Sequence, residues 1–533
     1  MIDKVRSKYI LDEIFKFIKN KRKLNIIKYS KKLSKSLDIT KKDFKVYELL
    51  NEFNQEYDSN IDDIDIDELD LSEKNLGDEG LKFLCKIDFK NLNVLNLCHN
   101  QITHISILSK ANFRKLKELD LSENRIKDIK VFEKVNFEDL EELYLDTNQI
   151  QKIDVFQKVN FKKLKILILR ENKFKDINVL EKVNFKDLEE LDLATNLIDK
   201  IAVLKKVDFK KLKELTLKCY SIQDINILKE VNFPELTTLS ISSCGIEDIE
   251  PLQKVNFKKL EILYLSGNSI ENINILEKVD FKELKELYLG SINLKDFKFL
   301  EKVNFKNLKI LYLGSNSIRN IYFLAKVNFN ELEELDLNKN NVSDISVLEK
   351  VKFNKLKILI LNNNQISNIN ILEKVKFSEL KELQLNQNNI KNISILEKVN
   401  FKELELLELC GNKLKDISIL DKVNFKKLKN LNLCLNEISD ISVLEKANFE
   451  DLNSLDLMSN KISDIKVLKK VKFYKLTELN LSYNSIKDIS VFSKTNFKDL
   501  NKLDLSYNKI NQKEYSSIIS KLKTKVEEFL IYD

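Results

Sequence analysis

The sequence predicts an α/β solenoid, a curved array of 24-residue repeats with parallel β-strands on its concave face. The first reason is a phenylalanine that recurs every 24 residues from Phe89 to Phe497, eighteen times in all. The second is a recurring L-x-L pair that is followed by an asparagine. The third is composition, because 7 Gly and 2 Pro among 533 residues leave little material for linkers. We therefore expect one continuous array.

Each position of the repeat has a structural role, as residues 116–139 (LKELDLSENRIKDIKVFEKVNFED) illustrate. Leu119 and Leu121 alternate with Asp120 at period two, which is typical of a short, half-buried strand whose aspartate faces outward. The apolar residues of the I-x-D-I segment and the phenylalanine fill the rest of the cross-section. One unit can bury this face only against its neighbours, so isolated units should not fold.

The asparagine that follows the strand should be buried, with its amide bonded to backbone groups of its own and the next turn. This column contains Asn100, Asn124, Asn148, Asn172 and Asn196. It is interrupted at Tyr220, Cys244 and Ile292. The interruptions indicate either a local bend of the solenoid or sequence drift with some loss of stability.

The L-x-x-L-x-L-x-x-N skeleton resembles leucine-rich repeats, and the I-x-D-I-x-x-L segment resembles the subclass found in the protein phosphatase 1 regulator and in bacterial internalins. The resemblance covers about residues 61–510, with about 18 regular repeats and one irregular first repeat. That first repeat, residues 69–84, resembles the helix-bearing repeats of the ribonuclease-inhibitor type. The resemblance implies a curved leucine-rich-repeat array that binds another protein, and it says nothing about which protein.

The end of the chain, residues 511–533, is predicted to be a capping helix. Asn511 with Glu514 three residues later resembles a capping box. The apolar residues that follow have helical spacing: Tyr515, Ile518, Ile519, Leu522, Val526 and Phe529.

Residues 1–60 suit a basic, helical N-terminal module, because residues 1–45 carry 15 Lys or Arg against 5 Asp or Glu. This module could be a cap for the array. Alternatively, residues 9–18 and 24–33 resemble an F-box, with a leucine in place of its proline. That resemblance implies a substrate adaptor that binds the linker protein of a ubiquitin ligase through Leu11, Glu13, Ile14 and Ile18. A third alternative is binding of an anionic lipid or nucleic-acid surface through the basic residues.

Overall charge and cysteine usage suggest a cytoplasmic protein. The net charge of +7 arises from 91 basic and 84 acidic residues, which indicates solvated faces. The six cysteines show no metal-type spacing, and there is no long apolar run for a membrane span. A lysine recurs near the end of nearly every repeat, but a glutamate usually precedes it and no aromatic residues interleave, which argues against nucleic acid. Cys410 and Cys434 share a column, so a disulfide is conceivable, but two free thiols are expected in such a compartment.

Catalysis is not expected. His99 and His104 are the two histidines, and neither has a metal-ligand partner at a useful spacing. The sequence has no nucleophile elbow and no phosphate-cradling glycine loop. We therefore predict no catalytic residues, cofactor site or metal site, and a non-enzymatic scaffold for protein–protein interaction.

The outward residues of the strands are the expected contact surface. Three successive repeats place Tyr264, Tyr288 and Tyr312 between the two leucines of the L-x-L pair, flanked by Ile262 and Ile310. Small residues follow each tyrosine, so we expect an exposed aromatic row with space beside it, as at protein-binding hot spots. The alternative is that recent duplication copied the tyrosines. An acidic column, formed by Glu118, Asp120, Glu142, Asp146, Glu190 and Asp192, is either a site for a basic partner or a solvated strand face.

Overall fold

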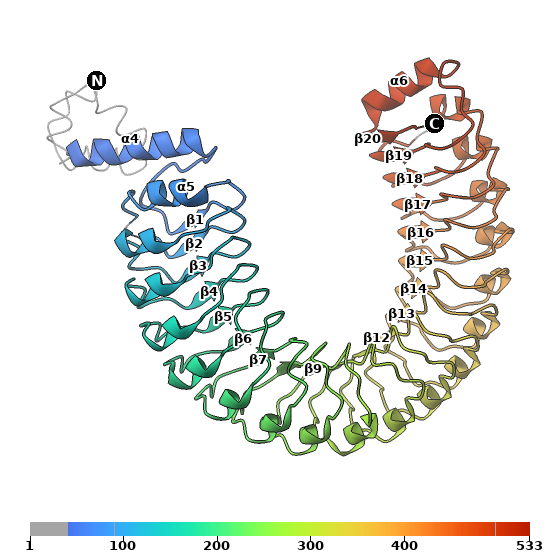
Figure 1. The fold of residues 1–533 in the computed structure, drawn as a ribbon. Helices are drawn as coiled ribbons and strands as arrows, with labels where there is room; N and C mark the ends of the chain where they lie inside the picture. Colours follow the sequence, from blue (N-terminus) through green and yellow to red (C-terminus); the bar gives the residue numbers. More distant parts are fainter. Residues whose placement is uncertain (1–40, 90, 496, 533) are drawn as a thin grey trace, which may run out of the picture. The chain divides into compact units, whose positions relative to one another are not determined.

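The computed structural model describes residues 41–89, 91–495 and 497–532 (Figure 1). The chain forms two compact units, Met1–Phe257 and Lys258–Asp533. Each unit is a solenoid of short parallel strands, and the strands from β2 to β18 are each followed by a turn, a 3₁₀-helix and a second turn that leads to the next strand. The predicted solenoid class and the 24-residue period are therefore confirmed.

The first unit pairs each strand with the next in sequence, so that Leu119 lies opposite both Leu95 and Leu143. The α-helices in its described part are α4 (Lys41–Glu56) and α5 (Gly77–Leu84). Its strands are β1 (Glu68–Asp70), β2 (Val94–Asn96), β3 (Glu118–Asp120), β4 (Glu142–Tyr144), β5 (Ile166–Ile168), β6 (Glu190–Asp192), β7 (Glu214–Thr216) and β8 (Thr238–Ser240). Its 3₁₀-helices are η2 (Ser106–Lys110), η3 (Lys130–Glu133), η4 (Asp154–Gln157), η5 (Asn178–Lys182), η6 (Ala202–Lys205), η7 (Asn226–Lys229) and η8 (Glu250–Gln253).

The second unit repeats this arrangement. Its strands are β9 (Ile262–Tyr264), β10 (Glu286–Tyr288), β11 (Ile310–Tyr312), β12 (Glu334–Asp336), β13 (Ile358–Ile360), β14 (Glu382–Gln384), β15 (Leu406–Glu408), β16 (Asn430–Asn432), β17 (Ser454–Asp456), β18 (Glu478–Asn480), β19 (Lys502–Asp504) and β20 (Glu528–Leu530). Its helices are η9 (Ile273–Lys278), η10 (Lys298–Glu301), η11 (Tyr322–Ala325), η12 (Ser346–Glu349), η13 (Asn370–Glu373), η14 (Ser394–Glu397), η15 (Ser418–Asp421), η16 (Ser442–Glu445), η17 (Lys466–Lys469), η18 (Ser490–Ser493) and α6 (Ser516–Lys525).

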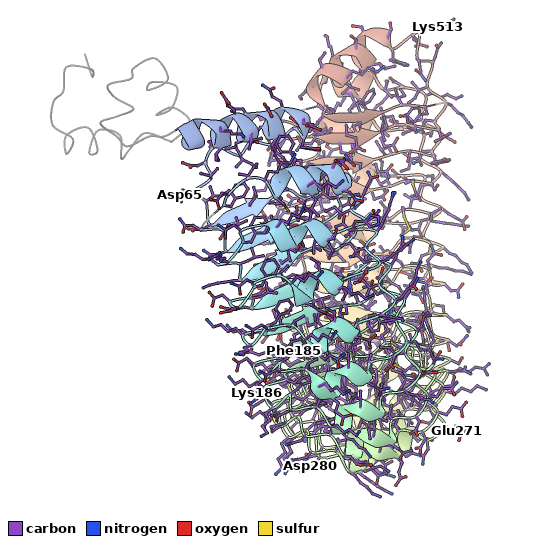
Figure 2. All side chains as sticks on the ribbon, turned by 60° about the vertical axis from the view of Figure 1, so that its left-hand side comes forward. Asp65, Phe185, Lys186, Glu271, Asp280 and Lys513 are labelled. Carbon is purple, nitrogen blue, oxygen red and sulfur yellow. A yellow bond between two sulfur atoms is a disulfide. The ribbon has the colours of Figure 1, made fainter. Side chains whose placement is uncertain are left out.

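The leucine and phenylalanine columns form the core of each unit. Leu119 and Leu121 are fully buried, and Phe185 points inward at 2% exposure while its neighbour Lys186 projects into solvent (Figure 2). In most repeats an aspartate or asparagine at the third position of the I-x-D-I segment precedes the 3₁₀-helix, and its side-chain oxygen accepts the backbone N–H two residues later. Asp128 Oδ1 accepts from Lys130 N at 2.9 Å in this way. A short 3₁₀-helix is therefore sufficient to turn the chain.

The asparagine column forms a buried ladder of hydrogen bonds. Asn148 Nδ2 donates to the carbonyl oxygens of Leu145 at 3.2 Å and Leu121 at 2.9 Å, and its Oδ1 accepts from Ile126 N at 2.9 Å. Leu121 and Ile126 belong to the preceding repeat. The prediction that the amide bonds backbone groups of its own turn is confirmed. The prediction that it also bonds the next turn is wrong, because its other partners lie in the preceding turn.

The interruptions of this ladder are filled locally. At Tyr220 the phenol is 70% exposed, and the thiol of buried Cys219 donates instead to Leu193 O at 3.3 Å. Burial raises the pKa of Cys219 to about 11, so the thiol stays protonated and remains a donor. Cys244 and Ile292 are buried as well. A sulfur atom from the adjacent position thus replaces the missing amide at one interruption.

The ends of the array differ from its middle. Helix α5 lies in the irregular first repeat, and Phe83 from it meets Phe53 of α4 edge-on at 5.6 Å between ring centroids. At the other end, α6 starts at Ser516, later than Asn511, whose Oδ1 accepts from Glu514 N at 3.4 Å. Residues 528–530 are not helical as predicted but form β20, which pairs with β19. The chain therefore ends its sheet with one further strand.

Removing one amide of the ladder should destabilise its own and the adjoining repeats. Asn364 donates to Leu337 O, Leu361 O and Asn362 O, and accepts from Val342 N at 3.0 Å. In Asn364→Ala we expect a loss of about 2–3 kcal/mol in local stability, because buried backbone groups lose their partners. Hydrogen exchange of peptides from β12 to β14 measures it. Asn354→Ala, at an exposed turn, is the control, and equal protection in both variants would contradict the role of the ladder.

Candidate binding surface

The strands fix which side chains face outward. In β10 the middle residue, Leu287, is fully buried, whereas Glu286 and Tyr288 on either side are half-buried on the strand face. The parallel register aligns Tyr288 with Tyr264 on β9 and with Tyr312 on β11. The three tyrosines that we call the tyrosine row are therefore neighbours across three strands, as their spacing predicted.

The tyrosine row is a continuous aromatic stack. The rings of Tyr264 and Tyr288 are stacked, with centroids 4.4 Å apart and planes at 17°, and those of Tyr288 and Tyr312 lie 6.0 Å apart and are tilted by 36°. Tyr288 Oη donates to Glu286 Oε2 at 2.9 Å. Burial, followed by this bond to a carboxylate, raises the pKa of Tyr288 well above its usual range. The phenol therefore stays protonated at neutral pH.

Two glycines beside the row make room for its last ring. A Cβ at Gly290 would overlap the ring of Tyr312, and one at Gly314 would lie 3.0 Å from Tyr312 Oη and 2.5 Å from Asn338 Nδ2. The space that we expected beside the row is thus occupied here by Tyr312 itself. The expectation of free space beside the row is wrong at these two positions, because the ring of Tyr312 fills it.

The predicted flanking residues lie next to the row. Ile262 on β9 and Ile310 on β11 are both in register with Glu286 on β10, and both are half-buried. An isoleucine thus lies on each side of the carboxylate that accepts the Tyr288 hydroxyl. The structure brings all five predicted site residues together on three adjacent strands.

The acidic column of the first unit crowds like charges together. Burial, followed by the charges of Glu142 and Asp120, raises the pKa of Glu118. Burial, followed by the charges of Glu214 and Asp192, raises the pKa of Glu190. Arg170 Nε lies 3.7 Å from Asp146 Oδ2, which offsets only part of this charge. The carboxylates of this strand surface are therefore crowded and only partly neutralised.

A second aromatic pair escaped the sequence analysis. Tyr483 and Tyr507 are stacked with ring centroids 4.3 Å apart, are 51% and 47% exposed, and have φ of 55° and 56°. A bulky residue rarely adopts this left-handed backbone, which is favoured by glycine. Their separation of 24 residues, in the position before the ladder asparagine, was the available signal.

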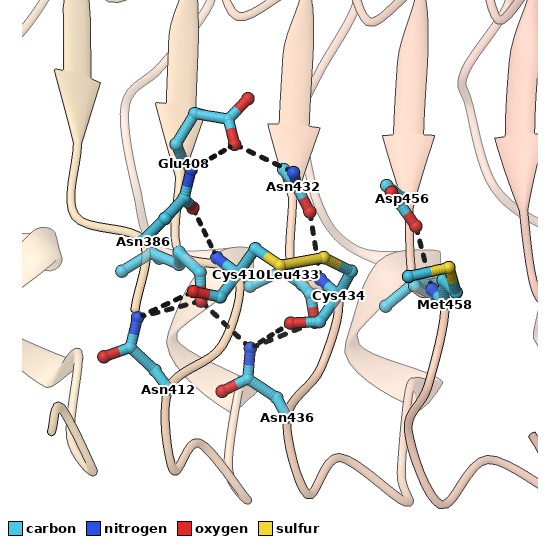
Figure 3. Close-up of a disulfide and its surroundings, with 12 residues drawn as sticks. Asn386, Glu408, Cys410, Asn412, Asn432, Leu433, Cys434, Asn436, Asp456 and Met458 are labelled. Carbon is cyan, nitrogen blue, oxygen red and sulfur yellow. Dashed lines mark hydrogen bonds between the residues drawn. A yellow bond between two sulfur atoms is a disulfide. The ribbon is translucent and has the colours of Figure 1, made fainter. Parts of the chain in front are cut away.

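Cys410 and Cys434 form a disulfide with a Cα–Cα distance of 4.5 Å (Figure 3). The expectation of two free thiols is wrong, because adjacent strands bring the same column position together. Asn386 Oδ1 accepts from Cys410 N at 2.7 Å, and Asn432 Oδ1 accepts from Cys434 N at 3.0 Å. Both asparagine amides donate to Glu408 Oε2. Polar side chains thus fix the backbone on both sides of the bridge.

The remaining predictions concern the N-terminal segments, metal binding and membrane-spanning helices. The F-box-like segments with Leu11, Glu13, Ile14 and Ile18 lie outside the described residues. Among the described residues, no group of three or more His, Cys, Asp or Glu side chains could hold a metal ion. No helix in the described part of the chain has the length and apolarity needed to cross a membrane.

Opening the disulfide should loosen the repeats that it joins. The bridge closes a loop of 24 residues, for which chain entropy gives about 3 kcal/mol. We expect Cys410→Ser/Cys434→Ser, or mild reduction, to speed hydrogen exchange in β15 to β17 and leave distant repeats unchanged. Cys98→Ser, at a free cysteine, is the control. Unchanged exchange after complete reduction would show that the bridge contributes nothing to stability.

Neutralising one crowded carboxylate should stabilise the first unit at neutral pH. The pKa of Glu190 is raised in the folded state, so its ionised carboxylate destabilises the fold. This destabilisation is present above the folded pKa and vanishes below the pKa of an unfolded glutamate. We expect Glu190→Gln to add about 0.5 kcal/mol at pH 7 and nothing near pH 3.5, measured by hydrogen exchange of β5 to β7. Glu189→Gln, which removes a carboxylate 2.5 Å from Lys213 Nζ, should not stabilise. Stabilisation by both variants would contradict the explanation.

Comparisons with known proteins agree with this architecture. A family model described as "Leucine Rich repeats (2 copies)" matches residues 90–134, 114–158 and 234–278, and one described as "Leucine Rich repeat" matches residues 475–492. A search of curated proteins gives no match. The finer resemblances, to the phosphatase regulator and internalin subclass and to an F-box, stay predictions.

Solved structures of several leucine-rich-repeat proteins are similar. TLR13, in its complex with ssRNA13, is 22% identical, with 88% of this chain and 69% of that chain covered and a TM-score of 0.59. An internalin (inlF) from Listeria monocytogenes is 22% identical over 85% of this chain and 97% of its own, with a TM-score of 0.36. A Leptospira interrogans leucine-rich-repeat protein is 21% identical over 72% and 96%, with a TM-score of 0.49. The repeat matches, the strand register and the asparagine ladder together show that the chain is built from leucine-rich repeats.

Proposed function

We propose that this chain is a protein-binding scaffold and that the tyrosine row is its main contact surface. The observation that carries the proposal is the continuous stack of Tyr264, Tyr288 and Tyr312 on the strand face. Three rings held by one another and by the sheet lose little conformational entropy when a partner covers them. Such rigid aromatic side chains are typical of the residues that dominate binding energy at interfaces.

The neighbours of the row indicate the chemistry of the partner. Glu286 lies beside Tyr288, and Glu334 and Asp336 follow on β12. Burial, followed by the charge of Asp336, raises the pKa of Glu334, so these carboxylates are crowded and poorly neutralised. A partner segment with an apolar or aromatic residue for the rings and a Lys or Arg for the carboxylates would satisfy both. We therefore propose a protein partner that presents a basic, aromatic surface.

The test is a triple substitution with a matched control. We expect Tyr264→Ala/Tyr288→Ala/Tyr312→Ala to reduce recovery of the partner by at least about 10-fold in affinity capture with quantitative mass spectrometry, because each ring contributes to binding. Tyr220→Ala/Tyr322→Ala/Tyr474→Ala removes three tyrosines that are 51–70% exposed and lie outside the strands, and it should retain the partner. Circular dichroism and thermal melting check that both variants fold.

A conservative variant separates binding from packing. Tyr288→Phe keeps the stacked ring and removes only the hydroxyl that donates to Glu286, so we expect a loss smaller than that of the triple variant. Equal recovery of every protein by the wild type and a folded triple-alanine variant would exclude the row as the contact surface.

The cytoplasmic location stays a prediction, and the Cys410–Cys434 bridge removes one of its supports. Alkylation of free thiols in intact cells before lysis, followed by mass spectrometry of both cysteines, would decide it. Alkylated Cys410 and Cys434 would indicate a reducing compartment, and a protected pair would indicate an oxidising one.

A further inference from the structure

A cavity of about 890 Å³ lies in the first unit beside η2 and η3, away from the strand face. Three successive repeats line it. Five of its lining residues are cations, which we call the basic cavity residues: Lys110, Arg125, Lys127, Lys130 and Lys134. All five are exposed to solvent. The volume lies within the range of small-molecule sites, roughly 300–1,000 Å³.

The lysine column that contains Lys110 and Lys134 is paired with acids in several other repeats. There the lysine that follows a 3₁₀-helix lies close to a glutamate of the preceding repeat, as Lys206 does to Glu181 at 3.0 Å and Lys326 to Glu301 at 3.1 Å. The corresponding position for Lys134 is Ser109. Within the described residues, none of the five cations has an ion-pair partner. Ser109 thus gives Lys134 no carboxylate, and its small side chain lines the cavity.

The carboxylates near the cavity are already engaged. Asp128 Oδ1 accepts from Lys130 N at 2.9 Å, and Glu133 Oε1 lies 3.2 Å from Lys158 Nζ. Asp78, behind His104, accepts from Thr103 Oγ1 at 2.6 Å and lies 2.8 Å from His104 Nδ1. Two acids therefore line the cavity beside five unpaired cations. The five cations therefore outnumber the two lining acids, and this excess of positive charge favours binding of an anion.

We propose that the basic cavity binds a small molecule that carries at least two phosphate groups. Lysine and arginine donate strong, charge-assisted hydrogen bonds to phosphate oxygens, and five of them around one cavity exceed what a single phosphate can accept closely. The volume likewise leaves room for more than one phosphate. The ligand is either a free polyphosphorylated compound or the headgroup of a phosphorylated lipid. This site is separate from the tyrosine row, so either can fail without the other.

Calorimetric titration of the full chain with inorganic tripolyphosphate tests the proposal. We expect saturable binding that weakens with salt, and a loss on the order of 10-fold or more in Arg125→Gln/Lys127→Gln/Lys130→Gln, because three charged donors are replaced by neutral polar side chains. The control is Lys413→Gln/Lys415→Gln/Lys466→Gln, which removes the same charge from the same repeat columns of the second unit. It should change affinity less than about 2-fold, because it lowers the net charge of the chain by the same amount but leaves the cavity intact.

Two further arms identify the source of the phosphates. Co-sedimentation with vesicles that contain 5% phosphatidylinositol 4,5-bisphosphate, lost in the cavity variant and competed by tripolyphosphate, would assign a lipid headgroup. Binding of tripolyphosphate without vesicle binding would assign a soluble ligand. Absence of tripolyphosphate binding at millimolar concentration, or equal weakening in both triple variants, overturns the proposal. Binding of a 20-nucleotide RNA more tightly than tripolyphosphate, with the same loss in the cavity variant, overturns the small-ligand assignment.

Discussion

The structure depends on one requirement: each repeat must satisfy the backbone groups of its neighbour where the chain leaves the strand. The ladder asparagines meet it by donating to carbonyl groups of two repeats and accepting one N–H, as Asn148 does with Leu121, Leu145 and Ile126. A buried carbonyl or N–H without a partner costs free energy, so this position tolerates little else. Where the asparagine is missing at Tyr220, the Cys219 thiol provides the donor.

The asparagine ladder fixes the register of the strands, and this register determines which outward side chains lie side by side. Because every strand is aligned with the next, residues 24 apart become neighbours about 5 Å apart, and one column becomes a continuous stripe. The same rule produces the tyrosine row, the stacked pair of Tyr483 and Tyr507, and the Cys410–Cys434 bridge. A single column position can thus be aromatic, charged or bridged without disturbing the core, since the leucines beside it remain buried.

The sequence was sufficient for features that follow from the period alone. The solenoid, the buried Leu and Phe columns and the alignment of Tyr264, Tyr288 and Tyr312 all follow from spacing. Features that depend on side-chain volume or on the ends of the chain did not follow. The ring of Tyr312 fills the space over Gly290, and residues 528–530 add a strand where helical spacing predicted a helix. Spacing shows which residues meet, but not which of them fills the gap between them.

The basic cavity shows the same distinction in electrostatic terms. A lysine in nearly every repeat indicates a solvated face, and in several repeats this interpretation agrees with the ion pairs, such as Lys158 with Glu133. The interpretation changes beside η2 and η3, where Ser109 stands at a position that holds an acid in several other repeats, so that Lys134 has no ion-pair partner among the described residues. In a repeat protein the departure from the consensus is therefore the informative signal. The consensus residues build the scaffold, and a ligand site arises where a partner in the repeating pattern is missing.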